Sequence, residues 1–345
     1  MKHLILIFVC LIIFNISAQE KKDNPIINFE KLWSEFNDRY ANFELKTVNW
    51  DNNYKEYRPQ INKNTSSKEL FDVSCKMLQE LKDGHVNIII NKNNITEENW
   101  CGSGKKFHIL EEFSEFDSLK VVVKKTLKKK KFSPLINQGK IIQYSVSEKY
   151  GYLRIDGMEG FKIGELSKVM KSAINIFENK KGVIIDVRFN GGGEDKVSYQ
   201  IAGRFTDKKR LGHYKRTRIK GTKAYTELDS WYLKPKGSKQ FTKPIIVLTS
   251  DWSASATEIF VMAMKELPYV TIVGDNTEGI FSDMYFFKLP NKWRVSLSHQ
   301  QYFSTDMKNY EGIGIPPDYK VLNYKKDKSD LVLAKAIEIL DNNTN

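Results

Sequence analysis

A serine-rich stretch from Ser250 to Phe260, "SDWSASATEIF", contains the first residues that could do chemistry. The run before it, "KPIIVLT", is apolar and rich in β-branched residues, and the residues after it have helical spacing. A strand is therefore predicted to end here and a helix to begin. A serine at such a junction is exposed, and the N–H groups after it lie at the positive end of a helix, where an oxyanion is stabilised. Serine and threonine also cap most helix starts, so the stretch taken alone favours capping.

A glycine-rich stretch is the second candidate. The buried strand "GVIID" leads into "VRFNGGGED" and then into a predicted helix. Three adjacent glycines leave backbone N–H groups uncovered, so these groups can close on a ligand oxygen. No Lys-Ser/Thr pair follows, which excludes a phosphate-binding loop. An ordinary flexible turn is the alternative interpretation.

A histidine between a predicted helix and a predicted strand is the third candidate. His85 lies in "LKDGHVNI", and only His108, His213 and His299 follow it in the chain. A single histidine is usually structural or simply exposed. It becomes a candidate general base when a nucleophile elsewhere needs a group that titrates near neutral pH.

Together the three patterns resemble the tail-specific (C-terminal-processing) serine peptidases of family S41. That family has an "R-x-N-x-G-G" motif after a core strand, matched here by Arg188, Asn190, Gly192 and Gly193. A later "S-A-S-A-[ST]-E-I" block is matched by "SASATEI", in which the family's nucleophile corresponds to Ser255. The resemblance covers roughly residues 140–320. It implies an α/β fold with a crotonase-like or ClpP-like core of β-β-α units.

One departure from the family concerns the catalytic base. The bacterial and chloroplast branch uses a lysine in "T-F-G-K-G", but the matching stretch here, "TEGIF", has Ile280 at that position. The tricorn-like branch has "L-x-D-x-H" at the end of an N-terminal helical domain, matched by Leu81, Asp83 and His85. It also has a glutamate before "G-x-x-P-D", matched by Glu311 in "YEGIGIPPD".

The resemblance to the tricorn-like branch implies a role for each residue. Ser255 attacks a peptide carbonyl, His85 acts as general base, and Glu311 orients the imidazole. The backbone N–H groups of Gly193 or its neighbour Gly192, and of Ala256, form the oxyanion hole. Two alternatives remain open. The chain could be a catalytically silent relative that binds peptide or hydrophobic ligands in the same cleft, or an envelope-associated binding protein.

The predicted elements divide the chain into four parts. Residues 1–19 have the charge and apolar run of a signal peptide that is cleaved after Ala18, which predicts export to the periplasm or the extracellular space. Residues 25–90 are predicted to form a small helical domain, 91–145 a short β-rich connecting segment and 146–345 the peptidase core. In the connecting segment "LKVVVKK" is interpreted as a strand. The segment is short for the PDZ module that many relatives carry.

Composition limits the partners. The formal net charge is +13, and the densest run, "KKTLKKKK" (124–131), is interpreted as a solvated hairpin tip, with an anionic envelope surface as the alternative partner. Nucleic acid is not expected, because the chain has no recognisable binding module. No metal or cofactor is implied, since the histidines and cysteines lack ligand spacing. Cys75 and Cys101 follow the leader, and the sequence leaves open whether they are paired.

Overall fold

The computed structural model describes residues 24–90, 100–102, 106–113, 116–139 and 141–343, and these residues form two compact units. The helical unit contains the described residues up to Lys105, together with Thr217–Glu227 and Ser282–Gln301. The core unit contains Lys106–Arg216, Leu228–Phe281 and the described part of Tyr302–Asn345. The mixed α/β class is as predicted. The predicted signal peptide, residues 1–19, lies outside the described residues.

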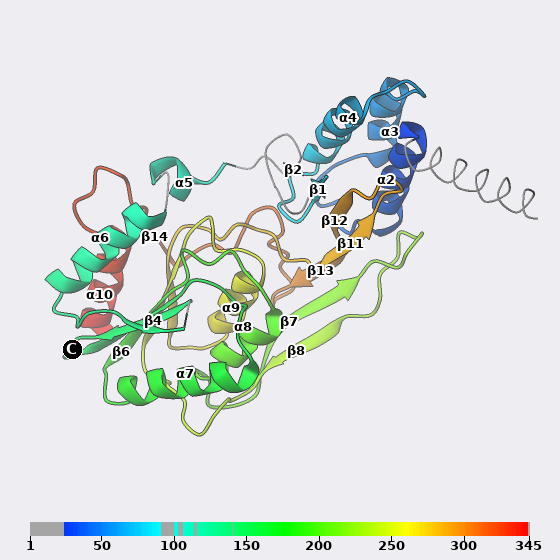
Figure 1. The fold of residues 1–345 in the computed structure, drawn as a ribbon. Coiled ribbons are helices and arrows are strands. Elements are labelled where there is room, and N and C mark those ends of the chain that lie inside the picture. The colour runs from blue at the N-terminus through cyan, green and yellow to red at the C-terminus, as the bar shows by residue number, and fades with distance from the viewer. Residues whose placement is uncertain (1–23, 91–99, 103–105, 114–115, 140, 344–345) are drawn as a thin grey trace, which may run out of the picture. The chain divides into compact units, whose positions relative to one another are not determined.

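The helical unit combines three helices with an antiparallel sheet (Figure 1). Its helices are α2 (Pro25–Arg39), α3 (Trp50–Tyr57) and α4 (Ser67–Gln79), with a 3-10 turn η1 (Arg58–Gln60) after α3. Its sheet has the order β11-β12-β1-β2, made of β1 (Asn87–Ile89), β2 (Trp100–Cys101), β11 (Met284–Lys288) and β12 (Arg294–Ser298). The predicted domain 25–90 is thus completed by strands from much later in the chain.

Local signals set the helix starts in this unit. The Asn24 side chain accepts hydrogen bonds from the N–H groups of Ile26 and Ile27, and Pro25 occupies the first helical position of α2. Ser66 and Glu69 form a capping box at the start of α4. The apolar faces of these helices and of the sheet share one core, which includes Phe29, Phe36, Leu78 and Leu81.

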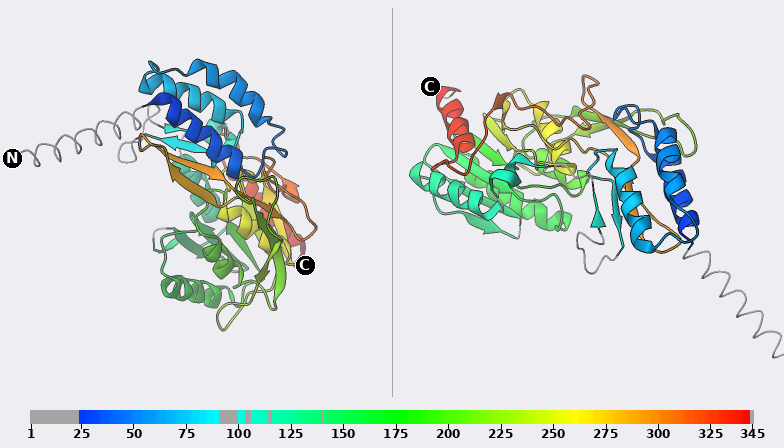
Figure 2. Two further views of the ribbon diagram at one scale, coloured as in Figure 1. Left: turned by 90° about the vertical axis from the view of Figure 1, so that its right-hand side faces the viewer. Right: turned by 90° about the horizontal axis from the view of Figure 1, so that it is seen from above.

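The core unit is built on a seven-stranded sheet of order β14-β10-β9-β6-β5-β4-β3 (Figure 2). The strands are β3 (Ile136–Gln138), β4 (Ile142–Val146), β5 (Tyr150–Ile155), β6 (Gly182–Asp186), β9 (Ile245–Thr249), β10 (Val270–Gly274) and β14 (Tyr319–Lys320). The five strands from β5 to β14 run parallel, whereas β3, β4 and β5 pair antiparallel. The helices are α5 (His108–Glu112), α6 (Phe116–Lys129), α7 (Ile163–Phe177), α8 (Asp195–Ala202), α9 (Ala256–Lys265) and α10 (Leu331–Asn343). A separate three-stranded sheet has the order β13-β7-β8, from Gln300–Phe303, Arg210–Thr217 and Asp229–Leu233.

Alternating side chains divide this sheet between two cores. In β6, Val183 and Ile185 join the core that includes α7, α8 and α9, whereas Ile184 joins the core that includes α5, α6 and α10. All five residues of β6 are buried, as are those of β9. The continuous apolar runs in the sequence therefore reflect a sheet covered on both faces by helices.

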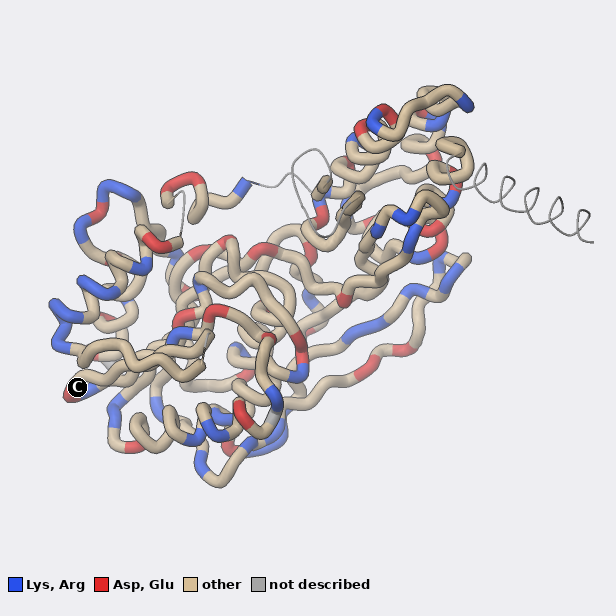
Figure 3. The backbone as a smooth tube through the Cα atoms, in the orientation of Figure 1, with Lys and Arg blue, Asp and Glu red and all other residues tan. Residues whose placement is uncertain are grey.

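The connecting segment differs from the prediction. Residues 119–125, predicted as a strand, lie in helix α6, and the lysines at 124–129 belong to its second half and not to a hairpin. Leu119, Val123 and Leu127 recur at four-residue steps and are buried, whereas the lysines from 124 to 131 are exposed. In Figure 3 lysine and arginine positions are blue along the backbone, including those of α6 and the turn after it. The run of three valines favoured a strand locally, but burial of a helical stripe decided the structure. Within the described residues, no helix has the length and apolarity needed to cross a membrane.

A buried ion pair ties the end of β6 to the start of α10. Arg188 donates to both carboxylate oxygens of Asp186 and to both of Asp330, at 2.7 to 2.9 Å. Burial raises the pKa of Asp186, but the Arg188 charge and hydrogen bonds outweigh it and hold the pKa below its ordinary value. The arginine of the glycine motif is therefore structural, and it fixes the strand end from which the glycine loop departs.

Replacing Arg188 with methionine should be strongly destabilising. Arg188→Met leaves two buried carboxylates without a counter-charge, so the free energy of unfolding should fall by about 3–5 kcal/mol. The matched control is Arg210→Met, whose partner Asp207 is 56% exposed, and its loss should cost less than about 1 kcal/mol. Urea denaturation of both variants tests this. Similar small losses in the two variants would contradict the structural role of Arg188.

Candidate active site

The candidate nucleophile occupies a strained turn between β9 and α9. Ser255 has φ of +56° and ψ of −124°, immediately before the first residue of α9. This backbone conformation is uncommon for a residue with a side chain and costs on the order of 1–3 kcal/mol. Ser255 is half-buried, and its neighbours Ala254 and Ala256 are buried. The turn therefore presents one hydroxyl at a helix N-terminus, as the sequence predicts.

The glycine loop packs directly against this turn. A Cβ atom added to Gly192 would lie 2.8 Å from the Cβ of Ser255, and Gly192 has φ of +111°. Any larger residue would displace the serine. Asn190 explains the polar position of the motif: its backbone carbonyl accepts from the N–H of Ala254 at 3.2 Å, and its side chain donates to the carbonyl of Ile155 at 3.1 Å.

The two candidate oxyanion donors in the loop are not equivalent. The N–H of Gly192 donates to the Asn190 side chain at 3.0 Å, so it is already engaged. The loop is bridged to Met158 by bonds from Met158 N–H to the Gly192 carbonyl and from Glu194 N–H to the Met158 carbonyl. Neither bond uses the N–H of Gly193. Gly193 is therefore the better candidate donor, with Ala256 at the first position of α9 as the second.

Sequence reasoning missed the role of Glu258. This fully buried carboxylate accepts from Ser255 N–H at 3.1 Å and from Ile280 N–H at 2.8 Å through one oxygen. Its other oxygen accepts from the Thr277 hydroxyl at 2.5 Å and from Gly279 N–H at 2.8 Å. Glu258 thus fastens the serine turn to the loop 277–281. The signal was present, since "S-A-T-E" is a capping-box spacing.

Glu311 holds the next residue of the same loop. Its carboxylate accepts from Phe281 N–H at 3.0 Å, and its own N–H donates to the Asn309 side chain at 2.8 Å. Glu311 is buried. The N–H of Gly312 donates to the carbonyl of Gly279 at 2.7 Å, so the segments around 279 and 312 are joined by backbone as well.

His85 belongs to the helical unit, where Asp83 shapes its turn. The Asp83 carboxylate accepts from His85 N–H at 2.9 Å and from the Tyr40 hydroxyl at 2.9 Å. The Ser296 hydroxyl donates to the His85 carbonyl at 2.7 Å. Burial lowers the pKa of the imidazole, against Asp83, Asp283 and the Ser282 backbone, which raise it. The "L-x-D-x-H" pattern therefore describes an aspartate that orients the histidine backbone.

The core unit brings together Ser255, Ala256 and the two glycines, and it also contains Glu311 and Glu258. Ile280, which stands where the "T-F-G-K-G" motif has lysine, is buried. Within the described residues, no group of three or more His, Cys, Asp and Glu side chains could hold a metal ion.

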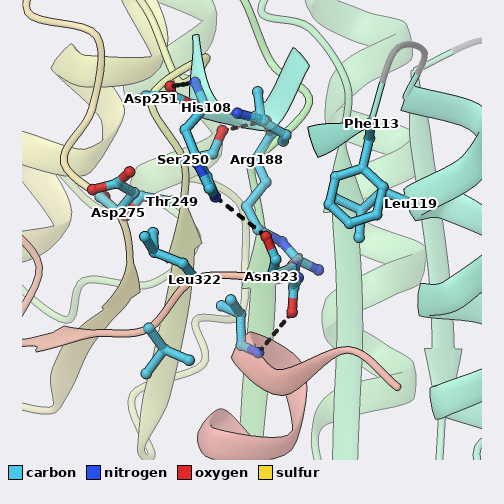
Figure 4. Close-up of a pocket in the computed structure, with 13 residues that line it drawn as sticks. His108, Phe113, Leu119, Arg188, Thr249, Ser250, Asp251, Asp275, Leu322 and Asn323 are labelled. Atoms are coloured by element: carbon cyan, nitrogen blue, oxygen red, sulfur yellow. Dashed lines mark hydrogen bonds between the residues drawn. The ribbon is translucent and has the colours of Figure 1, made fainter. Parts of the chain in front are cut away.

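A small pocket lies at the carboxyl ends of β6 and β9 (Figure 4). It is lined by Arg188, Ser250, Asp251, His108 and Asn323, among others. Its volume of about 30 Å³ suits one or two water molecules and not a peptide side chain. The pocket is therefore too small to be a peptide-binding site.

Burial of Glu258 predicts a pH dependence of stability. Burial raises its pKa to about 8, against the lowering effect of its hydrogen bonds to Thr277, Ile280 and Gly279. Between its ordinary value of 4.5 and about 8, the folded state binds a proton that the unfolded state has released. The free energy of unfolding should therefore fall as the pH rises through this window, by at most about 1.4 kcal/mol per pH unit from this group.

Glu258→Gln should make that slope shallower, as measured by urea denaturation at several pH values. Glu69→Gln, in the exposed capping box of α4, is the matched control, because the backbone and side chain of Ser66 lower the pKa of Glu69. Its slope should stay as steep as that of the wild type. A slope that Glu258→Gln leaves unchanged would mean that Glu258 stays ionised across the window.

Comparison with known proteins agrees with this geometry. The model of peptidase family S41 matches residues 149–321, and the model of the tricorn protease C1 domain matches residues 27–79. A carboxy-terminal-processing protease of Bartonella bacilliformis is 28% identical over 184 residues, which are 53% of this chain and 41% of that protein. The chain thus spans about two fifths of the length of this relative.

Two solved structures are similar over most of the chain. A protein of Parabacteroides merdae, crystallised as a candidate peptidase, has a TM-score of 0.76 and 29% identity, over 92% of this chain and 96% of that one. Mature CPAF has a TM-score of 0.64 and 13% identity, over 93% and 96%, which shows a shared fold alone. The S41 model spans half of the chain and includes both the glycine loop and the serine turn. The chain therefore belongs to peptidase family S41.

Proposed function

We propose that this protein is an exported serine endopeptidase that cleaves peptides or unfolded proteins through an acyl-enzyme on Ser255. The observation that carries the proposal is the strained, half-buried serine that packs against Gly192 and opens helix α9. A serine used only as a helix cap has no need of a positive φ, and ordinary caps have extended backbone. Such strain is retained where a side chain must be presented for reaction.

The proposed reaction begins with attack of the Ser255 hydroxyl oxygen on the peptide carbonyl. The carbonyl oxygen becomes an oxyanion, and the N–H groups of Gly193 and Ala256 stabilise it. The proton of Ser255 passes to His85, which returns it to the leaving amine as the C–N bond breaks. Water then repeats the sequence and releases the acid product and the free serine.

Two observations support the proposed pairing of His85 with Glu311: an imidazole nitrogen without a partner, and contacts of the two residues with consecutive positions of the chain. The Nδ1 atom of His85 is buried and has no hydrogen-bond partner among the described residues. The Ser282 backbone raises the pKa of His85, and the Glu311 carboxylate accepts from the N–H of Phe281. Phe281 and Ser282 are consecutive in the chain. A carboxylate near Nδ1 would fix the imidazole tautomer and stabilise its cation. Ile280 cannot accept a proton, so it supports histidine over lysine as the base.

Export and an anionic contact surface are further parts of the proposal. The apolar run within residues 1–19 supports export. The exposed lysines of α6 and the turn after it support contact with an anionic envelope surface through charge complementarity.

Labelling by a fluorophosphonate probe tests the activity. The wild type should form a covalent adduct on Ser255, and mass spectrometry of the labelled peptide identifies the site. Ser255→Ala should not label, whereas Ser172→Ala should still label, because Ser172 is exposed on helix α7, outside the serine turn and the glycine loop. A wild type that remains unlabelled would favour a catalytically silent relative that binds ligands in the same cleft.

The pH profile tests the base. Because burial lowers the pKa of His85, kcat/KM on an unstructured peptide should rise with pH, with a midpoint below about 6.5. Glu311→Gln removes a negative charge but keeps the shape, so it should lower turnover and move the midpoint further down. His108→Ala, at a histidine outside the proposed site, should leave the profile in place. If Glu311→Gln has the wild-type rate and midpoint, another group orients His85.

A further inference from the structure

Two cysteines share the core of the helical unit. Cys75 lies on the buried face of α4 and Cys101 ends strand β2, and the two are 8% and 6% exposed. Both belong to the same apolar cluster, and both are free thiols in the structure. The sequence leaves the state of these residues open, but the fold brings them together from positions 26 apart (101 − 75 = 26).

The two thiol groups lie near each other in this core. A hydrogen bond joins the side chains of Cys75 and Cys101, and this bond, together with burial, raises the pKa of the Cys75 thiol. Because both thiols are buried in one apolar cluster, a covalent bond between them would link α4 to β2 within that core.

We propose that Cys75 and Cys101 form a disulfide that fastens edge strand β2 to helix α4. The inference goes beyond the proposed peptidase function and does not depend on it. Each thiol loses one proton and one electron as the S–S bond forms. A disulfide-bearing oxidant accepts the two electrons and is released as two thiols, through a mixed disulfide with one cysteine that the other then displaces. Because the folded pair is buried, exchange takes place while the chain folds.

The bond would support the segment that contains His85. Strand β2 is a two-residue edge strand that pairs with β1. Cys101 lies opposite Ile88 of β1, and Trp100 lies opposite Ile89. Strand β1 begins two residues after His85. A disulfide from 75 to 101 encloses His85 in a closed loop, and it stabilises the fold mainly by restricting the unfolded chain.

The first experiment counts thiols. The chain is produced with its leader in a bacterial periplasm, and residues 20–345 are produced in the cytosol of the same host. The exported protein without residues 1–18 contains two cysteines, and after denaturation it should expose no group that reacts with a thiol reagent. A peptide map without reductant should contain one species that joins the segments around 75 and 101. Two reactive thiols in the denatured exported protein would overturn the proposal.

Refolding with oxidised glutathione tests the pair without relying on export. The cytosolic protein should lose both thiols, and its melting temperature should rise by on the order of 5–10 °C over the reduced form. The control is the double variant Cys75→Ala/Cys101→Ala, whose melting temperature should not respond to oxidant or reductant. Failure of the wild type to lose its thiols, or an unchanged melting temperature, would contradict the disulfide. The thiol count and the melting temperature do not depend on labelling of Ser255. A negative result with the fluorophosphonate probe would therefore contradict the peptidase proposal and not the disulfide.

Discussion

The site depends on hydrogen bonds that join the chain after β6 to the chain after β9. The Ser250 hydroxyl donates to the Arg188 carbonyl at 2.6 Å, and the Ser253 hydroxyl donates to the Val187 carbonyl at 2.9 Å. The N–H of Ala254 donates to the Asn190 carbonyl at 3.2 Å. Two of the three serines in "SDWSAS" therefore satisfy backbone carbonyls of the neighbouring segment. These bonds hold the glycine loop against the third serine, Ser255, at the start of α9.

Two capping boxes in the same protein show what the site adds to ordinary helix chemistry. At α4, Ser66 has an ordinary extended backbone and Glu69 is exposed, so the box satisfies only a helix end. At α9, Glu258 is fully buried and accepts hydrogen bonds from a second loop as well as from Ser255. Burying a carboxylate is costly unless it is hydrogen-bonded, and here the bonds stabilise a strained turn. The same local pattern thus serves a different purpose once tertiary contacts surround it.

Much of the core could be predicted because its signals are local. The alternation of apolar runs and helical spacing predicted the elements from β5 to β10 in order, except for β7 and β8, which it left out, and the glycine and serine motifs fall at the predicted strand ends. Helix α6 was not predicted, because a run of valines favours a strand until burial on one face is known. The helical unit was predicted only in part, since β1 pairs with β12, more than two hundred positions later. The capping box of Ser255 and Glu258 could have been predicted from its local spacing, whereas the contacts of Glu258 with the loop 277–281 could not, because no local pattern places that loop beside the serine.

The two carboxylates Glu258 and Glu311 bind the N–H groups of consecutive residues, Ile280 and Phe281. This arrangement gives a physical reason for isoleucine at position 280. The backbone N–H groups there are bound by carboxylates, and the buried isoleucine side chain fills the adjacent space without a charge that must be desolvated. In the helical unit, Asp83 fixes His85 through bonds made within that unit alone. Each unit therefore organises its own part of the proposed machinery through contacts made within that unit, and side chains fixed in this way lose less entropy when a substrate binds.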